Sequence, residues 1–132
     1  MRWYIYALKK YFTLEGRAGR AEFWYFNIIH FLISILLFMV CVSSVFSSGT
    51  VSSLSIIQTI LPAIFILYYI ATIPPNFALQ VRRLHDVNYS GWFLLVSLIP
   101  FVGIFILLIF FCRKGTPRNN TYGPVVYSTR PV

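Results

Sequence analysis

The polar stretch from Arg82 to Trp92 contains the residue types that could do chemistry, and it stands between two long apolar runs. His85, Asp86 and Ser90 are the residue types of a hydrolytic triad. On a helix, however, neighbouring residues point about 100° apart, so Asp86 is badly placed to orient the ring of His85. The sequence also shows no glycine-rich phosphate loop, paired-carboxylate site or metal-ligand spacing. We therefore expect no enzyme activity, no cofactor and no metal ion.

A second charged cluster, from Gly16 to Glu22, precedes the first apolar run. Arg82 and Asp86 are four residues apart, so they share a helix face and are expected to pair. Arg83 points elsewhere on such a helix, and Glu22 is its expected partner. The two clusters are thus predicted to meet on one side of a membrane. The predicted polar cluster consists of Arg17, Arg20, Glu22, Trp24, Arg82, Arg83, His85, Asp86, Ser90 and Trp92.

Two interpretations of this predicted cluster remain open. In the first, its role is structural, and the charges tie the loop after the second apolar run to the segment before the first. In the second, the arginines form a basic pocket that faces the cytoplasm and binds an anionic headgroup, a phosphate or an acidic partner. Trp24 and Trp92 would then supply aromatic surface at the membrane interface.

The composition is that of a membrane protein. Of the 132 residues, 58% are hydrophobic and only 11% are charged, whereas soluble domains are about 25% charged. So few charges could not cover the surface of a soluble globule. The net charge is +8, but the basic residues flank apolar runs, so we expect anionic lipid and not nucleic acid as their partner.

The predicted elements are helices in one membrane domain that covers residues 1–132. Residues 1–14 predict an amphipathic helix that lies in the headgroup plane. The runs 23–46 and 54–73 are each long enough to cross about 30 Å of hydrocarbon, so they predict two transmembrane helices. The pair Pro74-Pro75 is expected to end or restart the second of these.

The second half of the chain is predicted to begin with a polar cytoplasmic loop or helix over residues 77–91. Residues 92–112 form a third apolar segment, which Pro100 and Gly103 interrupt near its centre. This segment is either one kinked transmembrane helix or two half-helices that enter the membrane and return. The polar tail, residues 113–132, is expected to be extended or partly disordered.

The distribution of Lys and Arg places the N-terminus in the cytoplasm by the positive-inside rule. Three full spans would put the basic tail outside, against the same rule. A third segment that returns would keep the tail inside, but irregular backbone at membrane depth needs protein around it. On this ground the sequence favours three spans with a kinked third.

Three further residues lie inside the apolar runs. His30 is expected roughly 10 Å inside the membrane, where a hydrogen bond to a neighbouring helix is favoured over proton transfer. Cys41 and Cys112 have no ligand set nearby and are interpreted as small hydrophobic residues.

Several short motifs follow one another along the chain: Trp3-Tyr4, Leu8 to Phe12, Gly16-Arg17-Ala18, Glu22-Phe23-Trp24, Arg82-Arg83-Leu84-His85-Asp86, Ser90-Gly91-Trp92, Ile99-Pro100 and Asn120 with Tyr122-Gly123-Pro124. In these motifs, from about Trp3 to Pro124, the chain resembles the DUF805 family of small bacterial inner-membrane proteins. It departs from the family's usual pattern at Gly19, Asn88, Tyr89 and Phe93. The resemblance implies the bacterial inner membrane as the compartment, but it implies no reaction.

The sequence therefore favours an accessory or interaction protein of the inner membrane. Its expected partners are the lipid bilayer, anionic headgroups, and a second copy or another membrane protein. The alternative is a small oligomeric channel or transporter component. Against this alternative, the apolar runs contain no internal repeat and no acidic residue that could form a ring in a pore.

Overall fold

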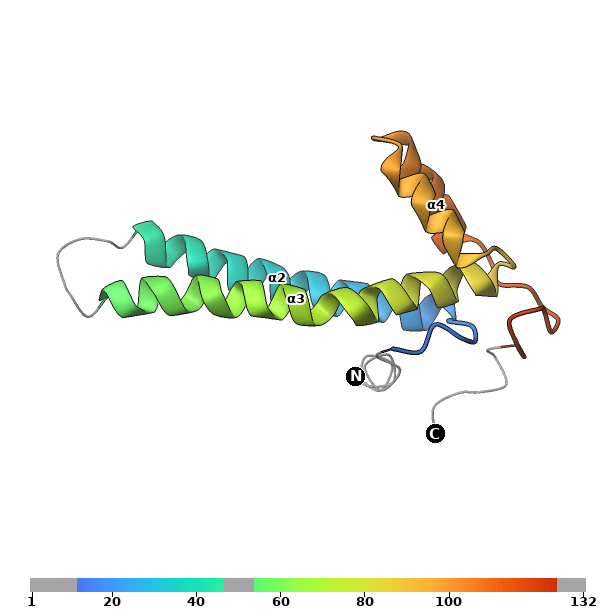
Figure 1. The fold of residues 1–132 in the computed structure, drawn as a ribbon, viewed down its shortest axis with the longest axis horizontal. Coiled ribbons are helices and arrows are strands. Elements are labelled where there is room, and N and C mark those ends of the chain that lie inside the picture. The colour runs from blue at the N-terminus through green and yellow to red at the C-terminus, as the bar shows by residue number, and fades with distance from the viewer. Residues whose placement is uncertain (1–11, 47–53, 126–132) are drawn as a thin grey trace. The chain divides into compact units, whose positions relative to one another are not determined.

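A computed structural model describes residues 12–46 and 54–125 (Figure 1). The regular elements in these ranges are all helices: α2 (Arg20–Phe46), α3 (Leu54–Asp86), the 3-10 helix η1 (Gly91–Leu98) and α4 (Val102–Cys112). The all-helical class is therefore confirmed. Of the predicted interfacial helix only residues 12–14 are described, and they are not helical, while the turn at 47–53 lies outside the described residues.

Two of these helices are long and apolar enough to cross a membrane, over Arg20–Ser44 and Thr59–Asp86. The first begins three residues before the predicted span, so that Glu22 lies in its first turn. A carboxylate at this place interacts favourably with the positive end of the helix dipole. Large apolar side chains cover most of the exposed surface of both helices, as expected of surfaces that face lipid.

The prolines do not interrupt α3, so the prediction that this helix ends or restarts at Pro74-Pro75 is wrong. The helix runs without a break from Leu54 to Asp86. Two missing backbone N–H groups weaken it there, but the turns that follow are held by tertiary packing. Pro75, Leu79 and Leu84 are all fully buried. Membrane helices also tolerate proline, because an open backbone in lipid would cost more.

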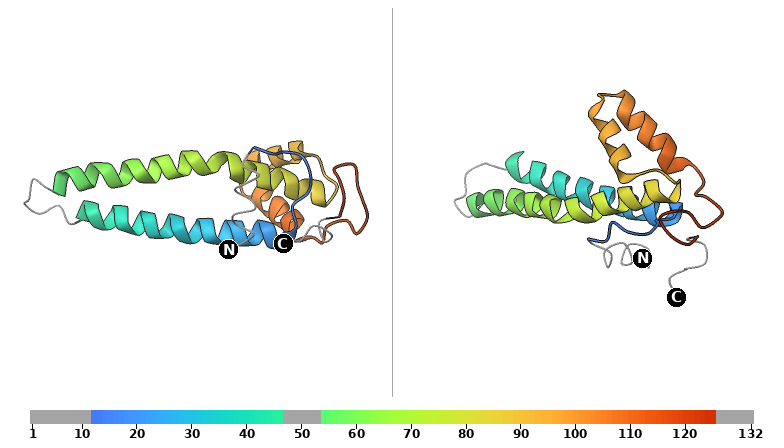
Figure 2. Two further views of the ribbon diagram at one scale, coloured as in Figure 1. Left: turned by 90° about the horizontal axis from the view of Figure 1, so that it is seen from below. Right: turned by 45° about the vertical axis from the view of Figure 1, so that its right-hand side comes forward.

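Contacts divide the described chain into two units, one of which is residues 28–73. Here α2 and α3 lie side by side and antiparallel (Figures 1 and 2). Nδ1 of His30 lies 2.8 Å from the hydroxyl of Tyr68, and the two rings are stacked. Phe38 and Phe65 also make a ring contact between the helices. The expected hydrogen bond from His30 to a neighbouring helix is confirmed.

The other unit, residues 12–27 and 74–125, contains the charged clusters. In it, η1 and α4 form a tight hairpin, drawn in orange in Figure 1 and seen from another side in Figure 2. The buried apolar core of this unit includes Phe23 and Phe26 of α2, Leu79 and Leu84 of α3, and Phe111 of α4.

The hairpin is made possible by the residues that interrupt the third apolar segment. Phe101 has φ 62° and ψ −57°, and the N–H of Val102 donates to the carbonyl of Pro100 at 2.7 Å, which is a γ-turn. A Cβ atom on Gly103 would lie 1.9 Å from the carbonyl oxygen of Val96, so only glycine allows this close approach. Residues 92–112 thus form two helices, and the single kinked helix is not observed.

Candidate functional site

A buried ion pair joins the start of α2 to the end of α3. Nη1 of Arg82 lies 3.0 Å from Oε1 of Glu22, and both side chains are only 1% exposed. A backbone hydrogen bond connects the same two regions, because the N–H of Ala18, in the loop before α2, donates to the carbonyl of Arg82 at 3.0 Å. The prediction that the two charged clusters meet is therefore confirmed.

Asp86 is the centre of a second, larger group of charges. One of its oxygens, Oδ1, accepts from Nε of Arg17 at 3.0 Å and lies 2.8 Å from Nη2 of the same residue. The other, Oδ2, pairs with Arg83. The predicted pairs, Arg82 with Asp86 and Arg83 with Glu22, are thus wrong. Residues three apart also share a helix face, and Arg83 contacts both Asp86 and the end of α4.

Arg83 also caps the C-terminal end of α4. Its Nε and Nη2 donate to the carbonyl of Phe111 at 3.2 and 3.1 Å, and Nη2 also donates to the carbonyl of Arg113. The last carbonyls of a helix have no partner within it and carry partial negative charge. A fully buried guanidinium at this end therefore stabilises α4 and holds the C-terminal end of the hairpin beside α3.

Arg17 connects the loop before α2 to the tail after α4. Beside its pair with Asp86, its guanidinium donates to the carbonyls of Thr116 at 2.7 Å and Arg118 at 3.0 Å. It also donates to the backbone carbonyl of Asp86 at 3.3 Å. One buried side chain thus holds three segments that are far apart in the sequence.

The tail in turn caps the C-terminal end of α3. The N–H of Thr116 donates to the carbonyl of Asp86 at 2.9 Å, and the amide of Asn120 donates to the carbonyl of His85 at 2.8 Å. Residues 113–125 are irregular, as expected, yet their bonds to α3 are specific. Residues 126–132 lie outside the described part of the chain.

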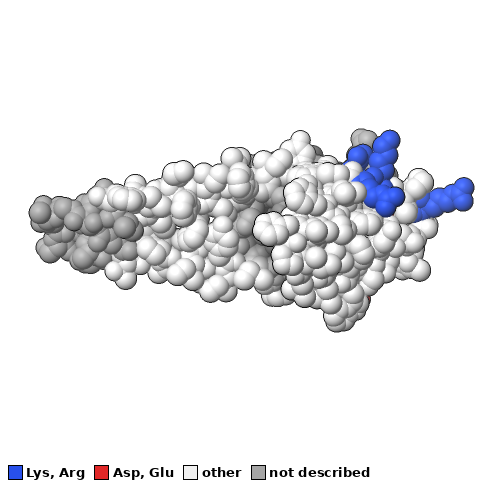
Figure 3. Space-filling model, turned by 90° about the horizontal axis from the view of Figure 1, so that it is seen from above, with Lys and Arg blue, Asp and Glu red and all other residues white. Residues whose placement is uncertain are grey.

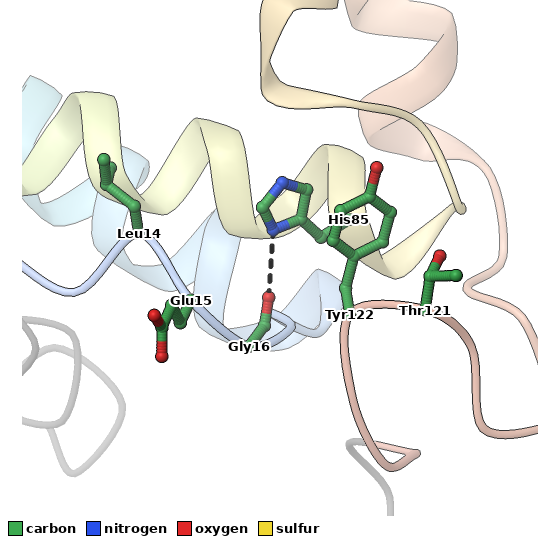
Figure 4. Close-up of a pocket in the computed structure, with 6 residues that line it drawn as sticks. All are labelled: Leu14, Glu15, Gly16, His85, Thr121 and Tyr122. Carbon is green, nitrogen blue, oxygen red and sulfur yellow. Dashed lines mark hydrogen bonds between the residues drawn. The ribbon is translucent and has the colours of Figure 1, made fainter.

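His85 lies at the edge of the ion pairs. Its Nδ1 is 3.3 Å from the carbonyl oxygen of Gly16, shown as the dashed line in Figure 4, and its ring stacks on that of Tyr122 with 3.9 Å between centroids. A carbonyl only accepts, so Nδ1 carries the proton in this bond and Nε2 of the neutral ring is an acceptor. These three residues, with Leu14, Glu15 and Thr121, line a cavity of about 390 Å³.

The other members of the predicted cluster take no part in the described ion pairs. Arg20 is exposed at the first residue of α2, and the rings of Trp24 and Phe23 form a T-shaped pair. Ser90 caps η1, where its hydroxyl oxygen accepts from the N–H of Trp92 at 3.4 Å. The side chain of Trp92 is 79% exposed.

Sequence reasoning missed the contribution of the tail. Thr116, Asn120 and Tyr122 all bind the end of α3 or its side chains. Gly115 passes so close that a Cβ atom would lie 2.1 Å from Oδ2 of Asp86. The motif around Asn120 was a signal that this segment has a fixed role, but composition alone favoured disorder.

The arrangement favours a structural role for the buried arginines. Three guanidinium groups face two carboxylates and a set of backbone carbonyls, and all three are at least 94% buried, with exposed fractions of 6% for Arg17, 1% for Arg82 and 0% for Arg83. Removing one partner of such a pair leaves an uncompensated buried charge. An external anion could reach these groups only by displacing their present partners.

Comparisons with known proteins identify the family of this chain. Residues 11–124 match the family described as "Protein of unknown function (DUF805)". The chain is 37% identical over 127 residues to the inner membrane protein YhaI of Escherichia coli K12, covering 93% of each chain. It is 36% identical over 124 residues to the inner membrane protein YhaH of the same strain, covering 94% of this chain and 95% of that one. No solved structure matches significantly. The chain therefore belongs to the DUF805 family.

Proposed function

We propose that this protein is an accessory protein of the bacterial inner membrane that binds anionic headgroups at the cytoplasmic surface. In this proposal the buried ion pairs are a clasp, formed by Arg17, Glu22, Arg82, Arg83 and Asp86. The clasp holds the η1–α4 hairpin and the basic tail beside the ends of α2 and α3. The names of the relatives and the two long apolar helices support the membrane location.

The clasp supports a topology in which the tail and the N-terminal loop share one side of the membrane. Arg17 precedes α2, and its guanidinium binds the backbone of residues 116 and 118, which follow α4. The limbs of the hairpin, 8 residues of η1 and 11 residues of α4, each extend roughly 16 Å. The hydrocarbon layer is about 30 Å thick. The hairpin is therefore too short to cross this layer, and in this proposal it enters part of the way and returns to the cytoplasmic side.

Two single-cysteine variants test this topology, Glu15→Cys and Thr121→Cys, each with Cys41 and Cys112 replaced by alanine. Both sites are exposed. We expect a membrane-impermeant thiol reagent to label neither variant in intact spheroplasts and both after permeabilisation. If Thr121→Cys is labelled from outside while Glu15→Cys is not, the third segment crosses the membrane and the proposed topology is wrong.

The single observation that carries the headgroup proposal is the division of the basic residues in the described ranges. The clasp arginines are buried and each is in an ion pair, whereas the others are exposed. On the face shown in Figure 3 the visible Lys and Arg side chains gather on the unit that holds the clasp. Attraction to anionic lipid is worth about 1 kcal/mol for each basic residue near the surface. The exposed basic residues are Arg20, Arg113, Lys114 and Arg118.

The tail residues allow a direct test by charge removal. In the triple variant Arg113→Gln, Lys114→Gln and Arg118→Gln, we expect affinity for anionic lipid to fall about 100-fold at low salt. The clasp uses only the backbone carbonyls of Arg113 and Arg118, so the fold should persist. Native mass spectrometry of protein released from nanodiscs with equimolar phosphatidylglycerol and phosphatidylcholine measures which lipid is retained.

The matched control keeps the charges and exchanges the side chains: Arg113→Lys, Lys114→Arg and Arg118→Lys. It should retain phosphatidylglycerol as the unsubstituted protein does. Higher salt should weaken retention of phosphatidylglycerol by the control variant and by the unsubstituted protein, because exposed charges are screened. Unchanged retention of phosphatidylglycerol by the charge-removal variant would refute the proposed binding surface.

A further inference from the structure

A second cavity, of about 450 Å³, lies between the N-terminal loop, α3 and η1. Its walls are mainly apolar, and Phe77, Val81, Trp92 and Leu95 contribute to them. Its size is within the usual range of small-molecule sites, which are mostly apolar with a few placed polar groups. The clasp residues do not line it, so it is separate from the ion pairs.

Two polar side chains, His85 and Ser90, line this apolar cavity. The Nδ1–H of His85 is bonded to Gly16, a residue of the adjoining smaller cavity, and Nε2 points away from Gly16 (Figure 4). This ring edge presents an acceptor. Ser90 uses its oxygen to accept from Trp92, so its O–H can still donate. The residues that line this apolar cavity thus include one with an acceptor, His85, and one with a donor, Ser90.

An alcohol is the group that matches this pair, because a hydroxyl both donates and accepts. A carboxylate or phosphate would meet an acceptor at His85, and a purely apolar chain would leave both polar groups without a ligand partner. Trp92 is an amphipathic ring at the rim, and such rings favour the membrane interface. We propose that this cavity binds a glycerol-headed amphiphile, with a hydroxyl between His85 and Ser90 and the alkyl chain against Phe77 and Leu95.

The test uses the full-length protein in detergent and two soluble probes, 1-decanoylglycerol and its dimethyl ether. Trp92 lines the site, so tryptophan fluorescence reports binding. The variant Trp92→Phe shows which part of the fluorescence change comes from this residue. We expect the alcohol to bind about 10-fold more tightly than the ether, because the ether cannot donate to Nε2. Equal affinities for the two probes would overturn the proposal.

Variants then locate the interaction. His85→Phe keeps an aromatic ring against Tyr122 and should weaken binding of the alcohol about 10-fold while leaving binding of the ether unchanged. Leu95→Trp changes a wall residue that is 55% exposed, so the fold tolerates it, and the larger ring should weaken binding of both probes. If both variants bind the alcohol as the unsubstituted protein does, the cavity is not its site.

Discussion

Replacing Asp86 with alanine is expected to lower the free energy of unfolding by about 3–5 kcal/mol. The change leaves the guanidinium groups of Arg17 and Arg83 buried without their shared carboxylate. It also weakens the attachment of the tail and of the α4 terminus, because both arginines position the carbonyls they bind. Thermal unfolding in detergent and the protein level in membranes measure the effect.

Two comparisons separate this effect from a general loss of charge. Glu15→Ala removes an exposed carboxylate from the same unit and should change stability by less than about 0.5 kcal/mol. Asp86→Asn keeps an acceptor oxygen, so its loss of stability should lie between those of Asp86→Ala and Glu15→Ala. If Asp86→Ala unfolds at the same temperature as Glu15→Ala, the clasp does not hold the fold together.

The second large effect is expected at Gly103, where substitution with alanine should destabilise the protein by about 3 kcal/mol, the upper end for overpacking. In an ordinary helix the same change stabilises, because alanine has a higher helix propensity than glycine. Here the new methyl group would meet the carbonyl oxygen of Val96 at 1.9 Å, and backbone cannot move aside as a flexible side chain can. The η1–α4 hairpin must open to admit it.

The close contact predicts a loss of stability, whereas helix propensity alone predicts a gain, so the sign of the change in stability distinguishes the two. Thermal unfolding should show a lower midpoint for Gly103→Ala, with faster proteolysis between η1 and α4. Val102→Ala changes the preceding residue, whose side chain is 56% exposed, and should leave the midpoint close to that of the unsubstituted protein. A raised midpoint for Gly103→Ala would show that the two limbs do not touch as described.

The apolar runs and the charged motifs made much of this architecture predictable. The two long helices follow from apolar runs that can cross the hydrocarbon layer, and the meeting of the two charged clusters follows from placing both segments on one side. The exact partners did not follow. Local helix geometry allows Asp86 to pair with Arg82 or with Arg83, and the choice depends on Arg17 and the α4 terminus, which arrive from elsewhere in the chain.

The dependence on packing between distant segments also explains why the effect of each proline was not predicted correctly. Pro74-Pro75 and Pro100 have equal local propensity to break a helix, yet α3 continues through the first and the chain turns at the second. The difference is what surrounds them. Pro75 is fully buried, whereas Pro100 is exposed and followed by a residue with positive φ. Sequence periodicity contains no information on that packing.

The bonds of Arg17 also determine when the structure can be completed during synthesis. Its guanidinium binds Asp86, 69 residues later, and the carbonyls of Thr116 and Arg118, 99 and 101 residues later. While the ribosome is still making residues 87–115, Arg17 and Arg83 lack most of the carbonyls that they bind in the finished fold. The two long helices can therefore enter the membrane early, but the bonds that join Arg17 to the tail form only after residue 118 has emerged. Until then water must solvate the charged groups that these carbonyls bind in the finished fold, so the groups cannot yet be buried.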